Sequence, residues 1–427
     1  MIKYLGSKRT LVPTLLGLLR EFPELHSIAD VFSGTARVGH ACKGAGWRVE
    51  SNDHNAYAHT LATCYVQADR ESWLESATAL VDEFNTLDGK PGYVTETFCE
   101  RSRFFQPHNG ARVDAIRQAI ADKDLPPELE AVMLTSLMEA ADRVDSTCGL
   151  QMAYVKKWAP RSYNDLTLRV PDMQPRSPHG DCRAHRLDAA EFAGTVQADI
   201  AYLDPPYNQH SYLSNYHIWE SLVLWDKPEV YGVACKRVDC KERKSDFNSK
   251  RRHDDAFRDT VAAVQAPLIV VSFNNEGYQS RAQIEATLSQ LGDVFVVTKD
   301  FKRYVGAQIG VYNPDGAKVG AVSHLRNEEY LYLVARPGLA DRVPDPLNRL
   351  SRFAARVDDP GTLDPEGRVS RVQRLLEDGT ALSLADVRTK TGLSEYQARM
   401  ALEALVGQGR VQANPGRTKR YSWVSEA

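Results

Sequence analysis

The sequence predicts an α/β protein in which a mostly helical segment interrupts a parallel sheet and a small separate module follows. Two short apolar runs, Ile28–Phe32 and Ala198–Leu203, each end abruptly at a turn rich in glycine or proline. The first run is followed by "SGTARVG", a helical stretch and a second apolar run, which is the order of a βαβ opening. At 427 residues, the chain is also too long for one ordinary hydrophobic core.

The N-terminal elements follow one another closely. We predict a strand at Ile28–Phe32, a turn of small residues, a helix ending near Gly44 and a strand at Trp47–Ser51. Residues 69–185 then become mostly helical and polar, so we assign them to an insertion in the α/β alternation.

The sheet resumes with the apolar run at Ala198–Leu203. Three further strands are predicted at Pro267–Phe273, Asp293–Thr298 and Glu328–Ala335. We therefore predict that residues 1–68 and 186–337 form one domain and that residues 69–185 are an insertion within it.

Proline and charge dominate the stretch after Ala335, so residues 338–365 are predicted to be a linker. The remaining residues, 366–427, read as a helix at Leu384–Thr391, a second helix at Glu395–Val406 and two short strands. This is the pattern of a winged helix, and such modules bind DNA or proteins. The wing carries the basic residues Arg417, Lys419 and Arg420.

Composition and charge limit the partners and the cellular location that this chain can have. The net charge of −3 requires any polyanionic partner to be bound by local basic patches. One such patch is 234–258, with nine basic and five acidic side chains, including Lys250, Arg251 and Arg252, and it reads equally as a solvated loop or as a DNA contact. Seven scattered cysteines favour reduced thiols and a cytoplasmic location. No apolar run approaches the roughly 18 residues of a membrane span. The cysteines and histidines also lack the spacing of metal ligands.

A glycine turn follows the first predicted strand, and an acid follows the second. In the turn "FSGTARVG", Gly34 and Gly39 allow backbone amides to approach a ligand closely. Asp53 ends the second strand, where an acid commonly holds ribose hydroxyls and otherwise caps a helix. This arrangement suggests a nucleoside-bearing cofactor.

The segment Asp204-Pro205-Pro206-Tyr207 ends the strand that begins at Ala198. Neither proline can donate to a strand ladder, and each fixes φ, so the carboxylate and the ring are held on a stiff turn. Ligands lie beyond the carboxyl ends of the strands in an open parallel sheet, so Asp204 should face the same crevice as Asp53 and Gly34.

With "YLGSK" at the N-terminus, "FSGTARVG", "DPPY", "SFNNEG" and "FKRYVG" in this order, residues 1–337 resemble the DNA adenine-N6 methyltransferases of the alpha group. The resemblance implies a Rossmann-like sheet that binds S-adenosyl-L-methionine, a target-recognition insertion and duplex DNA as substrate. In the chemistry it implies, an adenine is flipped out of the duplex, its amine donates to the Asp204 carboxylate and the Pro205 carbonyl, and Tyr207 stacks on the base.

The resemblance also assigns cofactor contacts, namely to Tyr4, Lys8, Phe32, Gly34, Asp53 and Asp188. For Lys8 we expect either the cofactor carboxylate or backbone carbonyls as the partner. One position departs from the family turn FxGxG, since Ala36 stands at the second glycine; if that position needs a positive φ, alanine costs around 1 kcal/mol.

Other functions remain open on the sequence alone. Cytosine-N4 methylation shares the amine chemistry, and RNA is a less favoured substrate. A DNA-binding regulator would use the C-terminal module and keep the α/β domain as a silent sensor. The resemblance further implies a cognate restriction endonuclease as a partner, while no feature sets the oligomeric state.

Overall fold

The structure is a computed structural model that divides into two compact units, Met1–Arg349 and Leu350–Ala427, which are described separately. It describes residues 1–274, 277–302, 311–312, 318–320, 326–339, 341, 345–357, 369, 372–373, 375–377, 381–391, 393, 395–408, 410–414 and 420–423.

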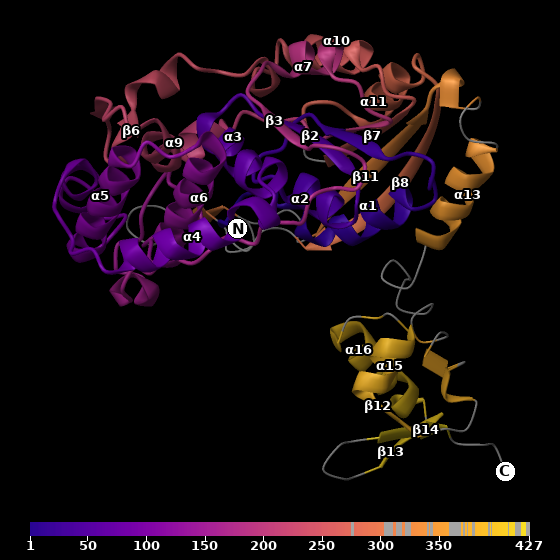
Figure 1. Ribbon diagram of the computed structural model, residues 1–427. Coiled ribbons are helices and arrows are strands. Elements are labelled where there is room, and N and C mark those ends of the chain that lie inside the picture. Colours follow the sequence, from indigo (N-terminus) through magenta and orange to yellow (C-terminus); the bar gives the residue numbers. More distant parts are fainter. Residues whose placement is uncertain are drawn as a thin grey trace. The chain divides into compact units, whose positions relative to one another are not determined.

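Within the described residues, the first unit is built on a seven-stranded sheet with the order β3-β2-β1-β4-β7-β11-β8 (Figure 1). Its strands are β1 (Ser27–Asp30), β2 (Arg48–Asn52), β3 (Arg183–His185), β4 (Ile200–Leu203), β7 (Leu268–Asn274), β8 (Asp293–Lys302) and β11 (Arg326–Ala335). The pairs among β3, β2, β1, β4 and β7 are parallel, and β11 runs antiparallel to both of its neighbours. The strand order reverses between β1 and β4, and such a switch point opens a crevice at the carboxyl ends of the strands.

Helices cover both faces of this sheet. On one face lie α7 (Ala189–Thr195), α10 (His253–Ala263) and α11 (Arg281–Leu288) (Figure 1). Their apolar side chains share a buried core with those of β1, β4 and β7. The other face carries α2 (Arg37–Gly44), with α1 (Val12–Leu19) next to it. A Cβ on Gly39 of α2 would lie 2.6 Å from the Ser51 Oγ, so only glycine allows this close approach of helix and sheet.

The insertion is helical, as predicted. Its elements are α4 (Arg70–Asn85), a π-helical turn η3 (Thr95–Glu100), α5 (Pro107–Asp122), α6 (Pro127–Arg143) and a 3₁₀ turn η4 (Pro160–Tyr163), and they follow α3 (Ala56–Ala62) and the π-helical turn η2 (Thr63–Gln67). The edge strand β3 lies inside the range predicted as insertion. Its three residues are polar or small and partly exposed, so the sequence lacks the apolar run that would have predicted a strand here.

The charged segment after β4 is folded. It follows α8 (Tyr212–Asn215), α9 (His217–Leu224) and β5 (Val230–Tyr231), and it contains β6 (Lys236–Arg237), η5 (Val238–Lys241) and η6 (Asp246–Asn248). The Arg237 guanidinium is almost fully buried and donates to both carboxylate oxygens of Asp226 at 2.7 Å. Among the helices that the structure describes, none is both long and apolar enough to cross a membrane.

Shorter elements complete the first unit, namely η1 (Lys8–Thr10), β9 (Val311–Tyr312), β10 (Lys318–Gly320) and η7 (Pro337–Leu339). Helix α13 (Pro346–Val357) occupies much of the segment predicted as a linker, and its Leu350 and Phe353 are buried. Three-residue spacing of these two apolar side chains places them on one helical face.

The second unit contains β12 (Leu382–Ser383), α15 (Leu384–Thr391), α16 (Glu395–Gly407), β13 (Val411–Asn414) and β14 (Arg420–Trp423). The strands pair in the order β12-β14-β13, and the two helices contribute Val387, Ala398, Leu402 and Leu405 to a common core. Of the three predicted wing cations, the exposed Arg420 lies on β14, whereas Arg417 and Lys419 fall outside the described residues. The assignment as a winged helix stays a prediction.

Candidate active site

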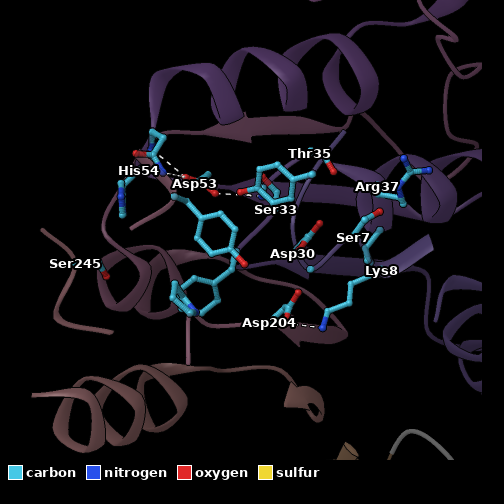
Figure 2. A pocket seen from close by; sticks show the side chains of 18 of the residues that line it. Ser7, Lys8, Asp30, Ser33, Thr35, Arg37, Asp53, His54, Asp204 and Ser245 are labelled. Atoms are coloured by element: carbon cyan, nitrogen blue, oxygen red, sulfur yellow. Dashed lines mark hydrogen bonds and ion pairs between the residues drawn. The ribbon is translucent and has the colours of Figure 1, made fainter. Parts of the chain in front are cut away.

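One pocket lies beyond the carboxyl ends of β1, β2 and β4, at the switch point of the sheet (Figure 2). Seven of the residues predicted from the sequence line it: Tyr4, Lys8, Phe32, Gly34, Asp53, Asp204 and Pro206. Its lining also includes residues that were not predicted, among them Asp30, Arg37, Asn55, Tyr212, Arg243, Ser245 and Asn248. Segments far apart in the chain therefore converge on the crevice expected for a ligand.

The glycine turn and the second strand are joined by one carboxylate. The Asp53 Oδ2 accepts the backbone N–H of Gly34 at 3.1 Å, and its Oδ1 accepts that of Asn55 at 2.9 Å. Gly34 has φ of 52°, and an added Cβ would lie 3.3 Å from the Tyr4 ring. Asp53 therefore holds the two loops that frame the pocket, and Asn55, not Asp53, is the N-cap residue of α3.

Ala36, the departure from the family turn, adopts a left-handed conformation with φ of 58° and ψ of 22°. Its N–H donates to the Ser33 carbonyl at 2.7 Å, which closes the turn before α2. The position thus requires a positive φ, and alanine pays about 1–2 kcal/mol of strain there.

Tyr4 is sandwiched between two other tyrosines. Its ring stacks on Tyr212 with centroids 5.1 Å apart and on Tyr216 with centroids 4.6 Å apart, and its hydroxyl lies 3.2 Å from that of Tyr57. Burial raises the pKa of the Tyr4 phenol, so the ring stays neutral. This stack ties the N-terminal segment to the helices that follow β4.

Lys8 contacts the carboxylate of the Asp-Pro-Pro-Tyr loop. Its Nζ lies 3.1 Å from the Asp204 Oδ1 (Figure 2). The same Nζ also pairs with Glu329 on β11. The partner of Lys8 is therefore a pair of carboxylates, and not the backbone carbonyls that were one of the two expectations. Burial raises the pKa of Asp204 to about 6, with Lys8 opposing the rise and Glu329 adding to it.

Asp30 is a second acid of the pocket, and it was not predicted. The residue is only 1% exposed, its Oδ2 accepts the Gly39 N–H at 3.2 Å, and its Oδ1 has no hydrogen-bond partner among the described residues. Burial, followed by the nearby charge of Asp204, raises its pKa to about 8. Its position at the end of the first strand was the available signal, because that is where a parallel sheet presents ligand-binding side chains.

Tyr207 lies apart from the rest of its motif. It does not line the pocket; its ring packs on Phe273 with centroids 5.7 Å apart, and its backbone carbonyl accepts the Tyr278 N–H at 3.0 Å. The amide of Asn248 donates to the carbonyl of Asn208 at 2.8 Å, so the loop is fixed on both sides of the tyrosine. Pro205 also stays outside the lining, whereas Pro206 belongs to it.

The remaining predicted residues lie elsewhere. Asp188 caps α7 by accepting the Ala190 N–H at 2.9 Å and does not line the pocket. Lys250 and Arg251 are exposed just before α10. Arg252, beside them, lines a neighbouring cavity.

The sheet order, the glycine turn and the loop at the end of β4 define an α/β enzyme of the methyltransferase class. The family model for the D12 class N6 adenine-specific DNA methyltransferases matches residues 4–271, and the chain belongs to this family.

Curated relatives agree with this assignment. The chain is 29% identical over 310 residues to the type II methyltransferase M.FokI of Planomicrobium okeanokoites, a match that covers 68% of this chain and 47% of M.FokI. It is 28% identical to the modification methylase StsI of Streptococcus sanguinis, with 68% and 46% covered. The type II methyltransferase M.CviAII of Paramecium bursaria Chlorella virus 1 is 27% identical, with 78% and 98% covered. The chain thus spans about half the length of the first two relatives and nearly all of the third.

Proposed function

We propose that this chain transfers a methyl group from S-adenosyl-L-methionine to the N6 amine of adenine in duplex DNA, at a specific site. The observation that carries the proposal is the position of Asp204 at the end of β4, in one pocket with Asp30, Asp53 and Gly34. The family to which residues 4–271 belong supports the same target atom.

The pocket suits a cofactor with a nucleoside and a cationic amino acid group. Asp53 offers carboxylate oxygens at the end of β2, where ribose hydroxyls are commonly bound. Asp30 offers a buried carboxylate oxygen without a partner among the described residues, and a cationic group beside it would favour its ionised form. Gly34 lets the backbone approach the ligand. When bound, S-adenosyl-L-methionine supplies the electrophilic methyl group.

The chain's own contribution to the reaction centres on Asp204. Its carboxylate accepts one N–H of the target amine and the Pro205 carbonyl accepts the other, which concentrates the lone pair on the amine nitrogen. Since the pKa of Asp204 is about 6, the carboxylate is mostly ionised at neutral pH. The two prolines hold both acceptors without reorganisation, and one preorganised contact of this kind is worth a few kcal/mol in a transition state.

An exocyclic amine inside a duplex is out of reach, so the adenine must leave the stack, at a cost of a few kcal/mol. An aromatic face returns about 1–3 kcal/mol to an extruded base. Tyr207, expected to provide that face, packs on Phe273, whereas Tyr212 lines the pocket and is itself braced by Tyr4. We therefore assign the stacking face to Tyr212.

The experiment is methylation of mixed-sequence duplex DNA by the purified protein with labelled cofactor, followed by mass spectrometry of the nucleosides. N6-methyladenine is the expected product, and Asp204→Asn should abolish it while cofactor affinity stays within a few-fold. N4-methylcytosine as the product would replace the adenine assignment by the cytosine one. DNA binding without any methyl transfer would instead favour the regulator with a silent fold.

A restriction endonuclease is the partner that fits such a methyltransferase, and M.FokI and StsI carry type II methyltransferase and modification names. Genomic DNA from cells that express the wild-type protein should carry methylated adenine in one sequence context. DNA methylated in this way should then resist one nuclease that cuts the unmethylated context, while DNA from Asp204→Asn cells should be cut. Methylation spread over unrelated contexts would contradict a role in restriction and modification.

A further inference from the structure

A second cavity, of about 540 Å³, lies next to the catalytic pocket. The two share the lining residues Ser211, Ser245 and Asn248, so the cavities adjoin one another. Its volume falls within the roughly 300–1,000 Å³ typical of small-molecule sites. A group attached to a ligand in the catalytic pocket could therefore extend into it.

The lining of this cavity is basic. It includes Lys236, Lys244 and Arg252, and no carboxylate belongs to it in the part of the chain that the structure describes. Arg252 pairs with the exposed Asp246 at 2.8 Å. For Lys236 and Lys244, by contrast, no carboxylate among the described residues lies within ion-pair distance.

Three other cations near this cavity, Arg237, Lys241 and Arg243, are already engaged. Arg237 pairs with Asp226 and Asp239, and Arg243 pairs with Glu220 and Asp239. Lys241 lies over the Tyr231 ring at 4.2 Å. Lys236 and Lys244 thus stand out as positive charges that line a cavity and pair with no carboxylate among the described residues.

We propose that this cavity binds a phosphodiester group of the target strand, next to the extruded adenine, and that Lys236 and Lys244 neutralise it. The inference rests on the proposed function, because the adenine would occupy the adjoining catalytic pocket and its own backbone would pass the residues that line both cavities. Lysine suits a phosphate as a compact point charge with three donors. The exposed Met152 at the same cavity offers an apolar surface for the deoxyribose.

This assignment differs from the one drawn from the sequence. Charge density pointed to Lys250, Arg251 and Arg252; the first two line neither cavity, and only Arg252 belongs to the lining of the second. They can still meet the backbone of the duplex from the surface, but the phosphate closest to the flipped base belongs to Lys236 and Lys244.

The test is a double-mutant cycle between protein charge and phosphate charge. The probe is a duplex that contains the methylated sequence found in the methylation experiment, with methylphosphonates either at the two phosphates that flank the target adenine or at two phosphates one helical turn away. Affinities are measured with the non-reactive cofactor analogue sinefungin for the wild-type protein, for Lys236→Gln/Lys244→Gln and for Lys227→Gln/Lys241→Gln. The last variant removes the same charge from lysines that lie over the rings of Trp225 and Tyr231, outside the cavity.

For the wild-type protein, neutral phosphates at the flanking positions should weaken binding at least tenfold more than neutral phosphates one turn away. In Lys236→Gln/Lys244→Gln this difference should vanish, and the slope of log affinity against log salt should fall by about 0.9 for each lost phosphate contact. The Lys227→Gln/Lys241→Gln variant should behave like the wild-type protein. Thermal melting and sinefungin affinity verify that both variants are folded.

Equal sensitivity to the flanking methylphosphonates in the wild-type protein and in Lys236→Gln/Lys244→Gln would overturn the phosphate site. The proposed function is judged separately, by methyl transfer from the wild-type protein to unmodified duplex. A wild-type enzyme that methylates adenine but shows no coupling refutes only the cavity assignment.

Discussion

The charges around Asp204 predict that two substitutions shift the pKa of its carboxyl group in opposite directions. Lys8 lies 3.1 Å from the Asp204 carboxylate and lowers its pKa, whereas Glu329 raises it. Replacing Lys8 by Met should therefore raise the pKa of Asp204, and replacing Glu329 by Gln should lower it. Both variants change the same proton equilibrium without touching the acceptor atoms themselves.

The magnitude follows from the geometry. The rise of the Asp204 pKa from 3.8 to about 6 corresponds to roughly 3 kcal/mol against ionisation. A cation this close typically lowers a carboxyl pKa by about 1–3. Without Lys8, the pKa of Asp204 should rise to between about 7 and 9, so the ionised fraction and the transfer rate at pH 7 should fall about 2- to 100-fold, or about tenfold for a rise of two, and recover as the pH rises.

The assay is single-turnover methyl transfer between pH 5 and pH 9 with saturating DNA and cofactor. The protonated carboxyl cannot accept the amine N–H, so each profile should fall on its acidic side with the pKa of Asp204. The acidic limb should move to higher pH in Lys8→Met and to lower pH in Glu329→Gln. Arg9→Met, which removes an exposed cation from the same turn, serves as the matched control and should leave the limb in place.

Two outcomes would refute this reasoning. A uniform loss of rate at every pH in Lys8→Met would mean that the lysine only supports the fold. A shift of both variants in the same direction would mean that their charges do not act on one carboxylate.

Three further predictions concern the turn, the buried acid and the second unit. Ala36→Gly should relieve left-handed strain and raise the free energy of unfolding by about 0.5–1 kcal/mol, whereas Ala41→Gly in α2 should lower it by about 1 kcal/mol; urea denaturation compares the two. Asp30 has a pKa of about 8 in the folded protein against 3.8 when unfolded, so the folded state binds the extra proton between these values and loses stability as the pH rises from about 4 to about 8. Asp30→Asn should flatten this dependence in thermal melts from pH 5 to pH 9, and equal slopes would show that Asp30 is already ionised. Truncation after Val357 should preserve folding and cofactor binding while weakening duplex affinity, because the sheet of the first unit is complete by Ala335; a chain that no longer binds cofactor would make the C-terminal unit part of the catalytic fold.

Local chemistry made much of the sheet readable from the sequence. The strands at Ile28, Ile200 and Leu268 are short apolar runs bounded by glycine, proline or charge, and such runs have few alternatives to a buried strand. The crevice was predicted in the same way, because Asp53 and Asp204 come directly after a strand and Gly34 lies in the turn that follows another. The sequence also showed that the energetic cost of alanine at position 36 depends on the sign of φ, and the structure gives a positive φ there.

Pairings between distant segments were decided only by the tertiary structure. Lys8 meets Glu329 because β11 inserts antiparallel between β7 and β8, and no periodicity in the sequence specifies that neighbour. The same holds for burial: Tyr207 turns to Phe273 while Tyr212 lines the pocket, although both follow Asp204 within a few residues. Charge counting found the basic segment but could not separate its cations. Arg237 and Arg243 pair with acids that folding brings to them, whereas Lys236 and Lys244 line a cavity and pair with no carboxylate among the described residues. The sequence determines which charged side chains are present, but the electrostatic energy of each one depends on the charges that the fold places next to it.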